Sequence, residues 1–406
     1  MSRRLAAISL ILCIVFAALP ARTARRPRYG GTLRVELGPA IASLDPAVAA
    51  STPDEAAAKS QIDGLIYDHR DPDGTFEGDP GSGPFAVTTF EPGKRATLAA
   101  NNNFREGRPF VDSIEITMGV SAHDRLLDLQ LNKSDLAEIP PQDARSASER
   151  GVRVSISQPD ELLALVFNAA DSAASRNPRL REAVAQSIDR AAIVNFILQK
   201  TGEPAGGLLP QWSSGTAFLF PTTADPARAK ELSSQFSPAA KLLLGYDSAD
   251  PLEQSVAERI AVNAKEAGIS LIAQALPKSA AGKPRAATEA LRFDAQLVRW
   301  RMPSANPAIA LKGALLEIST SRERADDTSA SAAPLTDQAS PQEIYNQQRD
   351  VLGRFTIVPL VWLPQVYGLS ARVRDWTVPG PGEEWPLADV WLDTDAGVAS
   401  GADKQP

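Results

Sequence analysis

The side chains that most often do chemistry in proteins are scarce in this sequence. It has two histidines, His69 and His123, and one cysteine, Cys13. None of them forms a zinc, dithiol, serine-hydrolase or phosphate-loop motif with its neighbours. A tight transition-metal site would need more imidazole or thiolate ligands than these. The sequence therefore predicts no catalytic residue, no cofactor and no metal site, and we expect that the chain is not an enzyme.

Carboxylates are plentiful, with 49 acidic residues, so no single pair of them stands out. Four aspartates, Asp68, Asp71, Asp73 and Asp79, gather in a turn-rich stretch, but their spacing does not follow a calcium-binding EF-hand loop. A solvated loop is the prediction there. The net charge of −7 argues against a nucleic-acid partner, because such proteins present a basic surface.

The elements that would position a site are clearest between residues 161 and 210. An apolar run from Leu162 to Phe167 predicts a buried strand. Asn177 followed by Pro178 predicts a helix start, and Gly202 supplies a C-terminal cap. We expect one long helix between them, because apolar residues recur every three or four positions: Leu180, Val184, Ile188, Ala191, Val194 and Leu198.

A strand–helix–strand unit follows. Residues 242–247 and 269–276 are apolar runs of strand length, and the intervening residues carry one apolar helix face that ends before Gly268. Two strands joined in this way pair in parallel through a right-handed crossover. The unit predicts an α/β half. Further strands are expected at 32–37, 114–118, 152–157 and 293–300, with apolar segments at 352–368 and 387–392.

The first 24 residues read as a signal peptide. Arg3 and Arg4 precede the apolar run from Leu5 to Leu19, and small residues up to Ala24 allow cleavage. Cys13 lies inside the apolar run and is poorly placed for lipidation. We expect a periplasmic protein exported by a Sec-type signal peptide. The alternative is a membrane tether formed by an uncleaved N-terminal segment, although the run is short for a span of about 20 residues.

At 406 residues the chain is long for one core, so two domains are expected. Three segments in order, Phe167–Asn168, Arg179–Val194 and Gly206–Pro210, closely resemble the extracytoplasmic solute-binding proteins of family 5, which serve peptide- and nickel-type ABC importers. Gly30–Val35 and Ser43–Pro46 resemble the N-terminal signature of that family. The resemblance implies a mixed α/β, two-lobed architecture of the periplasmic-binding-protein type II kind, with a discontinuous domain I.

The resemblance also implies a division of the chain. After the signal peptide (1–24) we expect domain I at 25–166, domain II at 167–298, and a return to domain I at 299–396 with a flexible loop at 319–342. The tail, 397–406, is expected to be disordered. Domain I is shortened, because relatives carry roughly a hundred more residues near 47–82. The hinge between the lobes is expected at Phe167, Asn168, Val298 and Arg299.

The expected ligand contacts also come from the resemblance. In peptide-binding relatives, a tryptophan is followed by an Asp-Pro pair whose aspartate holds the amino terminus of the peptide. Here Trp300 and Arg301 are present, and Asn306 precedes Pro307. An amide loses the charge-assisted hydrogen bond. Trp300, Arg301, Asn306 and Trp212 are the candidate contacts, whereas Trp362 is expected in the core and Asp189–Arg190 is expected as a surface or interdomain pair.

Together these features predict the periplasmic solute-binding component of an ABC importer. It would capture a small solute, a peptide or a peptide-like molecule, by hinge closure and deliver it to a permease driven by separate ATPase subunits. The protein is expected to be a monomer. The alternative is a degenerate or sensory receptor-like relative that no longer serves transport, which the shortened lobe and Asn306 would support.

Overall fold

The computed structural model describes residues 26–48, 50, 53–70, 76–77, 81–168, 176–214, 221–236, 241–276, 293–322 and 335–393. The expected signal peptide, the C-terminal tail, and Asp71, Asp73 and Asp79 lie outside these residues. Within them, no helix combines the length and the apolarity needed to cross a bilayer.

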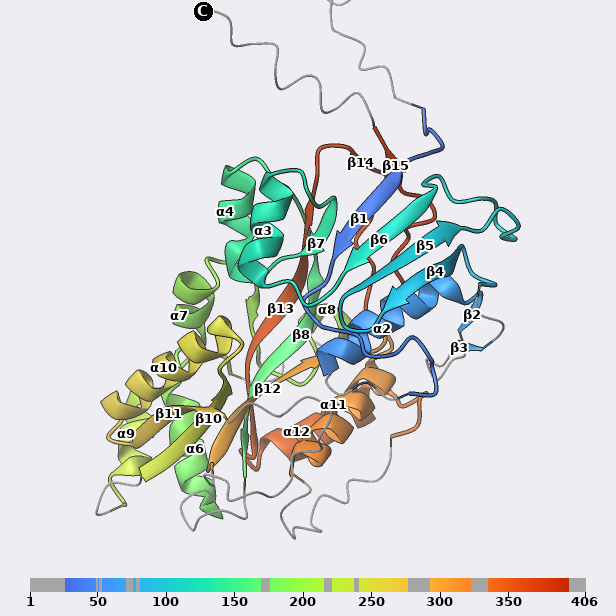
Figure 1. The fold of residues 1–406 in the computed structure, drawn as a ribbon. Helices are drawn as coiled ribbons and strands as arrows, with labels where there is room; N and C mark the ends of the chain where they lie inside the picture. Colours follow the sequence, from blue (N-terminus) through green and yellow to red (C-terminus); the bar gives the residue numbers. More distant parts are fainter. Residues whose placement is uncertain are drawn as a thin grey trace, which may run out of the picture.

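One mixed sheet of eleven strands runs through the whole molecule (Figure 1). Its order is β11-β10-β12-β8-β13-β7-β1-β6-β5-β4, and the short strand β9 also pairs with β13. The two long central strands are β8 (Arg153–Phe167) and β13 (Ile357–Leu369), which run antiparallel to each other. All other strands of the sheet lie on one side or the other of this pair.

The first half of the molecule is built on the β7 side of that pair. Its elements are β1 (Thr32–Glu36), α2 (Pro53–Ile66), β2 (His69–Arg70), β3 (Phe76–Glu77), β4 (Phe85–Glu91), β5 (Arg95–Ala100), β6 (Ser113–Thr117), α3 (Ala122–Gln130), β7 (Leu136–Glu138), the 3-10 turn η1 (Pro141–Asp143) and α4 (Ala144–Glu149). The C-terminal strands β14 (Val373–Arg374) and β15 (Trp391–Leu392) pair beside them, so both chain ends contribute to this half.

The second half is built around the other ends of β8 and β13, where β10, β11 and β12 lie on the β8 side and β9 pairs with the opposite edge of β13. Its elements are α6 (Pro178–Ser187), α7 (Arg190–Ala192), the π-helical turn η2 (Ile193–Ile197), β9 (Glu203–Pro204), α8 (Gln211–Ser214), α9 (Pro226–Ser233), β10 (Lys241–Asp247), α10 (Pro251–Glu266), β11 (Ser270–Leu276), β12 (Ala295–Arg301), α11 (Pro307–Arg322) and α12 (Pro341–Leu352). The predicted strand–helix–strand unit is confirmed, because β10 and β11 are parallel neighbours joined by α10.

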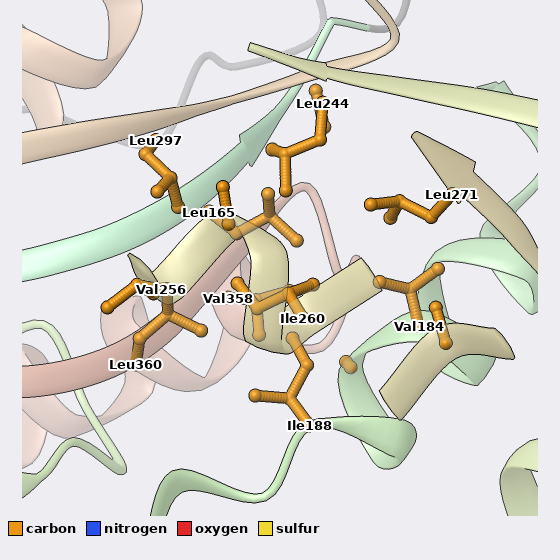
Figure 2. Close-up of a cluster of buried hydrophobic side chains, with 14 of the residues drawn as sticks. Leu165, Val184, Ile188, Leu244, Val256, Ile260, Leu271, Leu297, Val358 and Leu360 are labelled. Atoms are coloured by element: carbon orange, nitrogen blue, oxygen red, sulfur yellow. The ribbon is translucent and has the colours of Figure 1, made fainter. Parts of the chain in front are cut away.

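Both faces of β8 are buried in this second half, which explains its continuous apolar run. Alternate residues point to opposite faces of a strand. Leu163, Leu165 and Phe167 therefore pack against α6 and α10, in the cluster that Figure 2 shows around Ile260. Leu162, Ala164 and Val166 pack on the other face against α11 and α12.

Helix starts follow the expected capping chemistry. Asn177 accepts a hydrogen bond from the backbone N–H of Arg179 at 3.0 Å, with Pro178 as the first helical residue. The helix is shorter than predicted. α6 ends at Ser187, and Asp189 caps a new short helix by accepting from Ala192 N–H at 2.9 Å. The one long helix expected from the apolar spacing is thus two helices and a π-helical turn, because Asp189 offers the backbone a second start.

Asp189 and Arg190 do not pair with each other. The guanidinium of Arg190 is buried and donates from Nε to the carbonyl oxygen of Pro359 at 2.8 Å. Burial lowers the pKa of Arg190 to about 10. Asp189 and Arg190, expected as a pair on a surface or between domains, therefore act separately. Asp189 caps a helix, and Arg190 hydrogen-bonds to β13 from a buried position.

Two strands, β8 and β13, are shared by both halves. The hinge expected at Phe167, Asn168, Val298 and Arg299 remains a prediction. β12 pairs only with β8 and β10. The strands expected separately at 152–157 and 162–167 are the single strand β8. Pro159 and its polar neighbours interrupt the apolar pattern between them, so the sequence predicts two strands.

Two prolines face each other where the halves meet. Pro159 of β8 is the register partner of Pro364 of β13, and the register shifts on both sides of this pair. Proline has no amide hydrogen, so neither residue donates to the ladder here. We call this point the proline seam. The division into 25–166, 167–298 and 299–396 remains a prediction. α11 continues to Arg322, into the stretch expected as a loop from 319.

The first half is tied together by a buried carboxylate. Asp135 is fully buried and accepts hydrogen bonds from Arg34 and Arg372, which come from opposite ends of the chain. Ser370 Oγ lies 2.9 Å from Asp135 Oδ1. Burial alone would raise the pKa of Asp135, but the hydrogen bonds from Arg372 and Arg34 lower it to about 2. The carboxylate therefore stays charged and joins the two chain ends.

Candidate functional site

Two arginines and three acids meet beside the proline seam. Arg301 and Glu161 are register partners on β12 and β8, and Arg299 lies two residues back on the same face of β12. Arg299 Nε donates to Glu161 Oε1 in a short contact, and Arg299 Nη1 lies 2.6 Å from Asp250 Oδ2. Arg301 Nη2 lies 3.0 Å from Glu161 Oε2 and 2.9 Å from Glu138 Oε1. These five residues are called the charged cluster below.

The charged cluster joins both halves of the molecule. Glu138 belongs to β7 in the first half, whereas Asp250 is the N-cap of α10 in the second. Asp250 uses its other oxygen, Oδ1, to accept from the N–H groups of Leu252 and Glu253, which start the helix. Arg301 is the residue that reaches across, because it bonds to Glu138 and Glu161 from a single nitrogen.

The arginines hold their charge firmly. Burial alone would lower the pKa of Arg299, but Glu161 and Asp250 raise it above the ordinary value. Burial opposes the charge of Arg301 as well, and Glu138 and Glu161 more than offset it, so its pKa is also raised. Burial would raise the pKa of Glu161, yet Arg299 and Arg301 lower it to about 2. All three groups are ionised at neutral pH.

The cluster is nevertheless open to solvent on one side. The side chains of Arg299 and Arg301 are each 28% exposed and that of Glu138 is 38% exposed, whereas that of Glu161 is 6% exposed. Asp54, at the start of α2, lies near the same charges. The surrounding protein limits its hydration and raises its pKa, and Glu161 raises the pKa further. A charged solute group can therefore approach the cluster.

Of the predicted contacts, only Arg301 is part of the cluster. Trp300 lies on the opposite face of β12, where it is 8% exposed and packs edge-to-face on Trp362 with ring centroids 6.4 Å apart. Trp362 is buried, as expected for a core residue. Trp212 is 37% exposed and donates from Nε1 to the carbonyl oxygen of Pro159 at 2.8 Å, so it lies at the proline seam.

Asn306 starts a helix. Its Oδ1 accepts from Ala308 N–H at 2.9 Å and from Ile309 N–H at 3.4 Å, at the first turn of α11. Its Nδ2 donates to the carbonyl oxygen of Asp337 at 3.2 Å. The side chain is exposed and its amide is engaged by these bonds. Its contact with a ligand remains a prediction.

The four residues expected to form the hinge lie within paired backbone. Phe167 and Asn168 end β8 at its far end from the proline seam, where their N–H groups donate to Thr356 and Asp294. Asn168 Nδ2 also donates to Phe293 at 3.0 Å. Val298 and Arg299 pair with Ala164 and Leu163 in the middle of the β8–β12 ladder. Their role as a hinge remains a prediction.

In the described part of the chain, no three His, Cys, Asp or Glu side chains gather in a way that could hold a metal ion. His123 is exposed in the first turn of α3, whose Ser121 cap accepts from Asp124 N–H. His69 belongs to the short strand β2.

The acids of the cluster were not predicted from the sequence. One signal was available, because Asp160 and Glu161 enter a fully apolar strand, and buried carboxylates require partners. Two arginines spaced by one residue on β12 supply those partners for Glu161. Glu138 and Asp250 carry no such signal, since only the fold brings them near.

Comparison with known proteins places the chain among binding proteins. The family model described as bacterial extracellular solute-binding proteins, family 5, matches residues 32–316. Protein XP55 of Streptomyces lividans is 28% identical over 215 residues, which cover 49% of this chain and 39% of that protein. The probable D,D-dipeptide-binding periplasmic protein DdpA of Escherichia coli is 26% identical over 180 residues, covering 44% and 35%. The chain thus spans well under half the length of these relatives.

Solved structures share the fold at low sequence identity. The ABC transporter substrate-binding protein CtaP of Listeria monocytogenes matches with a TM-score of 0.68 and 17% identity, covering 90% of this chain and 100% of that one. The periplasmic binding protein DppA of Helicobacter pylori, solved with the peptide STSA, matches with a TM-score of 0.67 and 14% identity, covering 90% and 99%. The expected mixed α/β, two-lobed fold is confirmed. With more than half of its length matched by the family model, this chain belongs to the bacterial extracellular solute-binding proteins of family 5.

Proposed function

We propose that the protein is the solute-binding component of an ABC importer, and that it binds a peptide or peptide-like solute beside the charged cluster without transforming it. The observation that carries this proposal is the position of the cluster. Charges that solvent reaches, on Arg299, Arg301 and Glu138, come from both halves at the passage between them. Family membership and the peptide-bound relative DppA support the same class of solute.

A free strand edge next to the cluster supports an extended solute. β10 pairs with β12 only at Ala295 and Gln296, so no described strand pairs with the outer edge of β12 from Val298 to Arg301. An extended peptide can add to such an edge through backbone hydrogen bonds, which are independent of its side chains. The guanidinium and carboxylate groups would then meet the polar ends or side chains of the peptide.

The test measures binding by the purified mature chain. We expect tripeptides of the form Ala-Xaa-Ala to raise its melting temperature, because a ligand that binds only the folded state stabilises it by about 2.7 kcal/mol at a hundred times Kd. Calorimetric titration then gives Kd. A screen in which no peptide shifts the melting temperature would argue against peptide capture.

Trp212 supplies a second prediction at the site. It is an exposed aromatic held at the proline seam, so Trp212→Ala should weaken peptide binding roughly tenfold, or ~1.4 kcal/mol. Phe196→Ala is the matched control, since Phe196 is 81% exposed on η2, outside the cluster. Equal affinity loss in both variants would remove Trp212 from the site.

We propose that the halves close by bending at the proline seam. The absence of ladder donors at Pro159 and Pro364, with shifted register on both sides, weakens the pairing of the two shared strands at this level. Closure can be driven only by tighter binding of the solute to the closed form. The closed form would then dock on a membrane permease whose ATPase subunits supply the energy.

Export of the chain belongs to the same proposal. The family is extracellular by description, and the apolar run after Arg3 and Arg4 is proposed as a cleaved Sec-type signal peptide that delivers the protein to the periplasm. Mass spectrometry of the protein released from the periplasm should show an N-terminus after Ala21 or Ala24. A full-length chain recovered with the membrane would instead support the uncleaved tether.

A further inference from the structure

Asp160 is a buried carboxyl with one unsatisfied oxygen. It lies on β8 next to Glu161, and it is 1% exposed. Its Oδ2 accepts a short hydrogen bond from Gln365 Nε2, but its Oδ1 is buried without a hydrogen-bond partner among the described residues. Burying an ionised oxygen without a partner is costly, whereas a protonated carboxyl carries no such charge.

Charged and polar groups surround Asp160 from four strands. Arg301 of β12 is the cation that acts most strongly on it, and Glu161 of β8 and Glu138 of β7 are the anions. On β13, the hydroxyl of Tyr367 donates to Gln365 Oε1 at 2.6 Å. The Nε2 group of the same Gln365 side chain donates to Asp160.

The charges of the cluster do not balance. Arg299 and Arg301 face Glu138, Glu161 and Asp250, which leaves one negative charge in excess before Asp160 is counted. Outside the cluster, Arg125 beside Glu138 and Asp54 beside Glu161 add one charge of each sign. A further negative charge at Asp160 would enlarge that excess in a buried place. Burial raises the pKa of Asp160 to about 7, Arg301 opposes the rise, and Glu161 and Glu138 add to it.

Resting on the proposed capture of a solute at the charged cluster, we propose that Asp160 links this capture to release of a proton. In the empty protein Asp160 holds a proton. When a solute places a positive group beside the cluster, the O–H bond of Asp160 breaks, its electron pair stays on the carboxylate, and the proton passes to solvent. The positive group of the solute offsets the new negative charge, so the site selects cationic solutes and binds them more tightly at higher pH.

The sign of the effect follows from the proton balance. The empty protein holds more protons than the complex, so raising the pH favours the complex. Full linkage to one proton changes affinity by about tenfold per pH unit below the pKa of Asp160, and partial linkage by less. A solute without a positive group leaves the balance unchanged and shows a flat profile.

The experiment uses the peptides Ala-Lys-Ala and Ala-Gln-Ala with the mature chain. Calorimetric titrations between pH 5.5 and 7 avoid the titration of the peptide amino group, which lies near pH 8. For Ala-Lys-Ala we expect affinity to rise severalfold over this range. The titration is repeated at pH 7 in phosphate and in Tris, whose ionisation enthalpies differ. The difference between the two measured binding enthalpies gives the number of protons released. Ala-Gln-Ala should show a weaker slope than Ala-Lys-Ala.

Asp160→Asn is the diagnostic variant, because it keeps the size of the side chain and removes the titration. It should bind Ala-Lys-Ala without the pH slope and without proton release, and Asp160→Leu provides a second variant should the first not fold. Glu253→Gln is the matched control. Burial also raises the pKa of Glu253 to about 7, and this residue lies beside Asp247 and Asp250 at the other end of the cluster.

The outcomes are distinct. An unchanged slope in Asp160→Asn, or a slope lost only in Glu253→Gln, overturns the assignment to Asp160. A wild-type protein that binds Ala-Lys-Ala with no pH dependence overturns proton linkage while leaving solute capture intact. A wild-type protein that binds neither peptide overturns peptide capture itself, and with it this inference.

Discussion

At the scale of single residues, Glu161 is the carboxylate on which both arginines of the charged cluster converge. One carboxylate, 5% exposed as a residue, serves two arginines at once. Such an arrangement contributes little relative to an apolar core of the same shape, but it becomes costly when one partner is lost, because the remaining charges are then buried without compensation. The side chain is therefore a point where a small chemical change has a large effect.

Glu161→Gln should lower the free energy of unfolding by about 3–5 kcal/mol, the usual cost of breaking a buried ion pair. Urea denaturation followed by circular dichroism measures it. Glu149→Gln is the control, since Glu149 and Arg145 form an exposed pair, with side chains 63% and 72% exposed, for which a cost under about 1 kcal/mol is expected. Equal losses in the two variants would contradict the role given to Glu161.

Asp135 makes stability depend on acid. Its pKa is about 2 in the folded protein, whereas that of an ordinary aspartate, as in the unfolded chain, is 3.8, a difference equivalent to about 2 kcal/mol. Because the folded pKa is the lower one, this stabilisation is present above pH 3.8 and is lost as the pH falls through about 2. Asp135→Asn should therefore be less stable than wild type at pH 7, with a gap that narrows towards pH 2. Urea titrations at several pH values measure the gap, and a constant gap would refute the linkage.

At the scale of elements, helix caps explain much of what the sequence predicts. Asn306 caps α11 as Asn177 caps α6, so Asn306→Ala should cost about 1 kcal/mol of stability. Asn306→Asp keeps the cap. If the residue acts only as a cap, Asn306→Asp should leave peptide affinity unchanged in calorimetry. A gain in affinity for Ala-Lys-Ala would instead establish Asn306 as a ligand contact.

The elements with strong local signals were predictable. The strands β1, β6, β10, β11 and β12 and the start of α6 lie close to their expected places. The helices α11 and α12 are among those missed although their signals are present. Asn306-Pro307 precedes α11, and Ser340 with Glu343 forms a capping box at the start of α12. The polar composition of residues 319–342 predicted a loop there instead.

The candidate site was only partly predictable, because its members meet through tertiary structure. Arg301 belongs to the cluster, but Trp300 next to it points the opposite way, since neighbouring residues of a strand face opposite sides. Trp300, which the family resemblance named, therefore lies outside the charged cluster, and its contact with a ligand remains a prediction. Trp212 lies at the proline seam only because its indole bonds to Pro159, a contact between distant parts of the chain.

At the scale of the whole molecule, the proline seam is where closure is proposed. Pro159→Val and Pro364→Val together restore two amide hydrogens to the shared strands. If the seam is the hinge, the double variant should close less readily, so peptide affinity should fall severalfold while stability stays equal or rises. Calorimetry and urea denaturation measure the two quantities.

A control places the same change elsewhere on β13. Pro359 pairs with Ala164 inside the second half, and its carbonyl accepts from Arg190. Pro359→Val should leave affinity unchanged, because this level of the ladder lies away from the passage between the halves. Loss of affinity in Pro359→Val alone would move the hinge towards the residues first expected, near Phe167.

The overall architecture followed from the family resemblance and from the strand–helix–strand unit, but the connection between the halves did not. Local patterns report burial and periodicity, and they carry no information on which distant strand becomes a neighbour. β13 is fully buried and contains two prolines, so its sequence gives little sign that it is the strand running beside β8 through both halves.

The facing prolines have one further consequence. Since neither proline has an amide hydrogen, bending at that level breaks no hydrogen bond donated by these two residues. Side-chain bonds across the seam, above all those of Arg301 to Glu138 and Glu161, then contribute more of the energy difference between a wide and a narrow opening. We therefore expect substitutions that shift the balance between the open and closed forms to lie near Arg301 rather than elsewhere along β8 and β13.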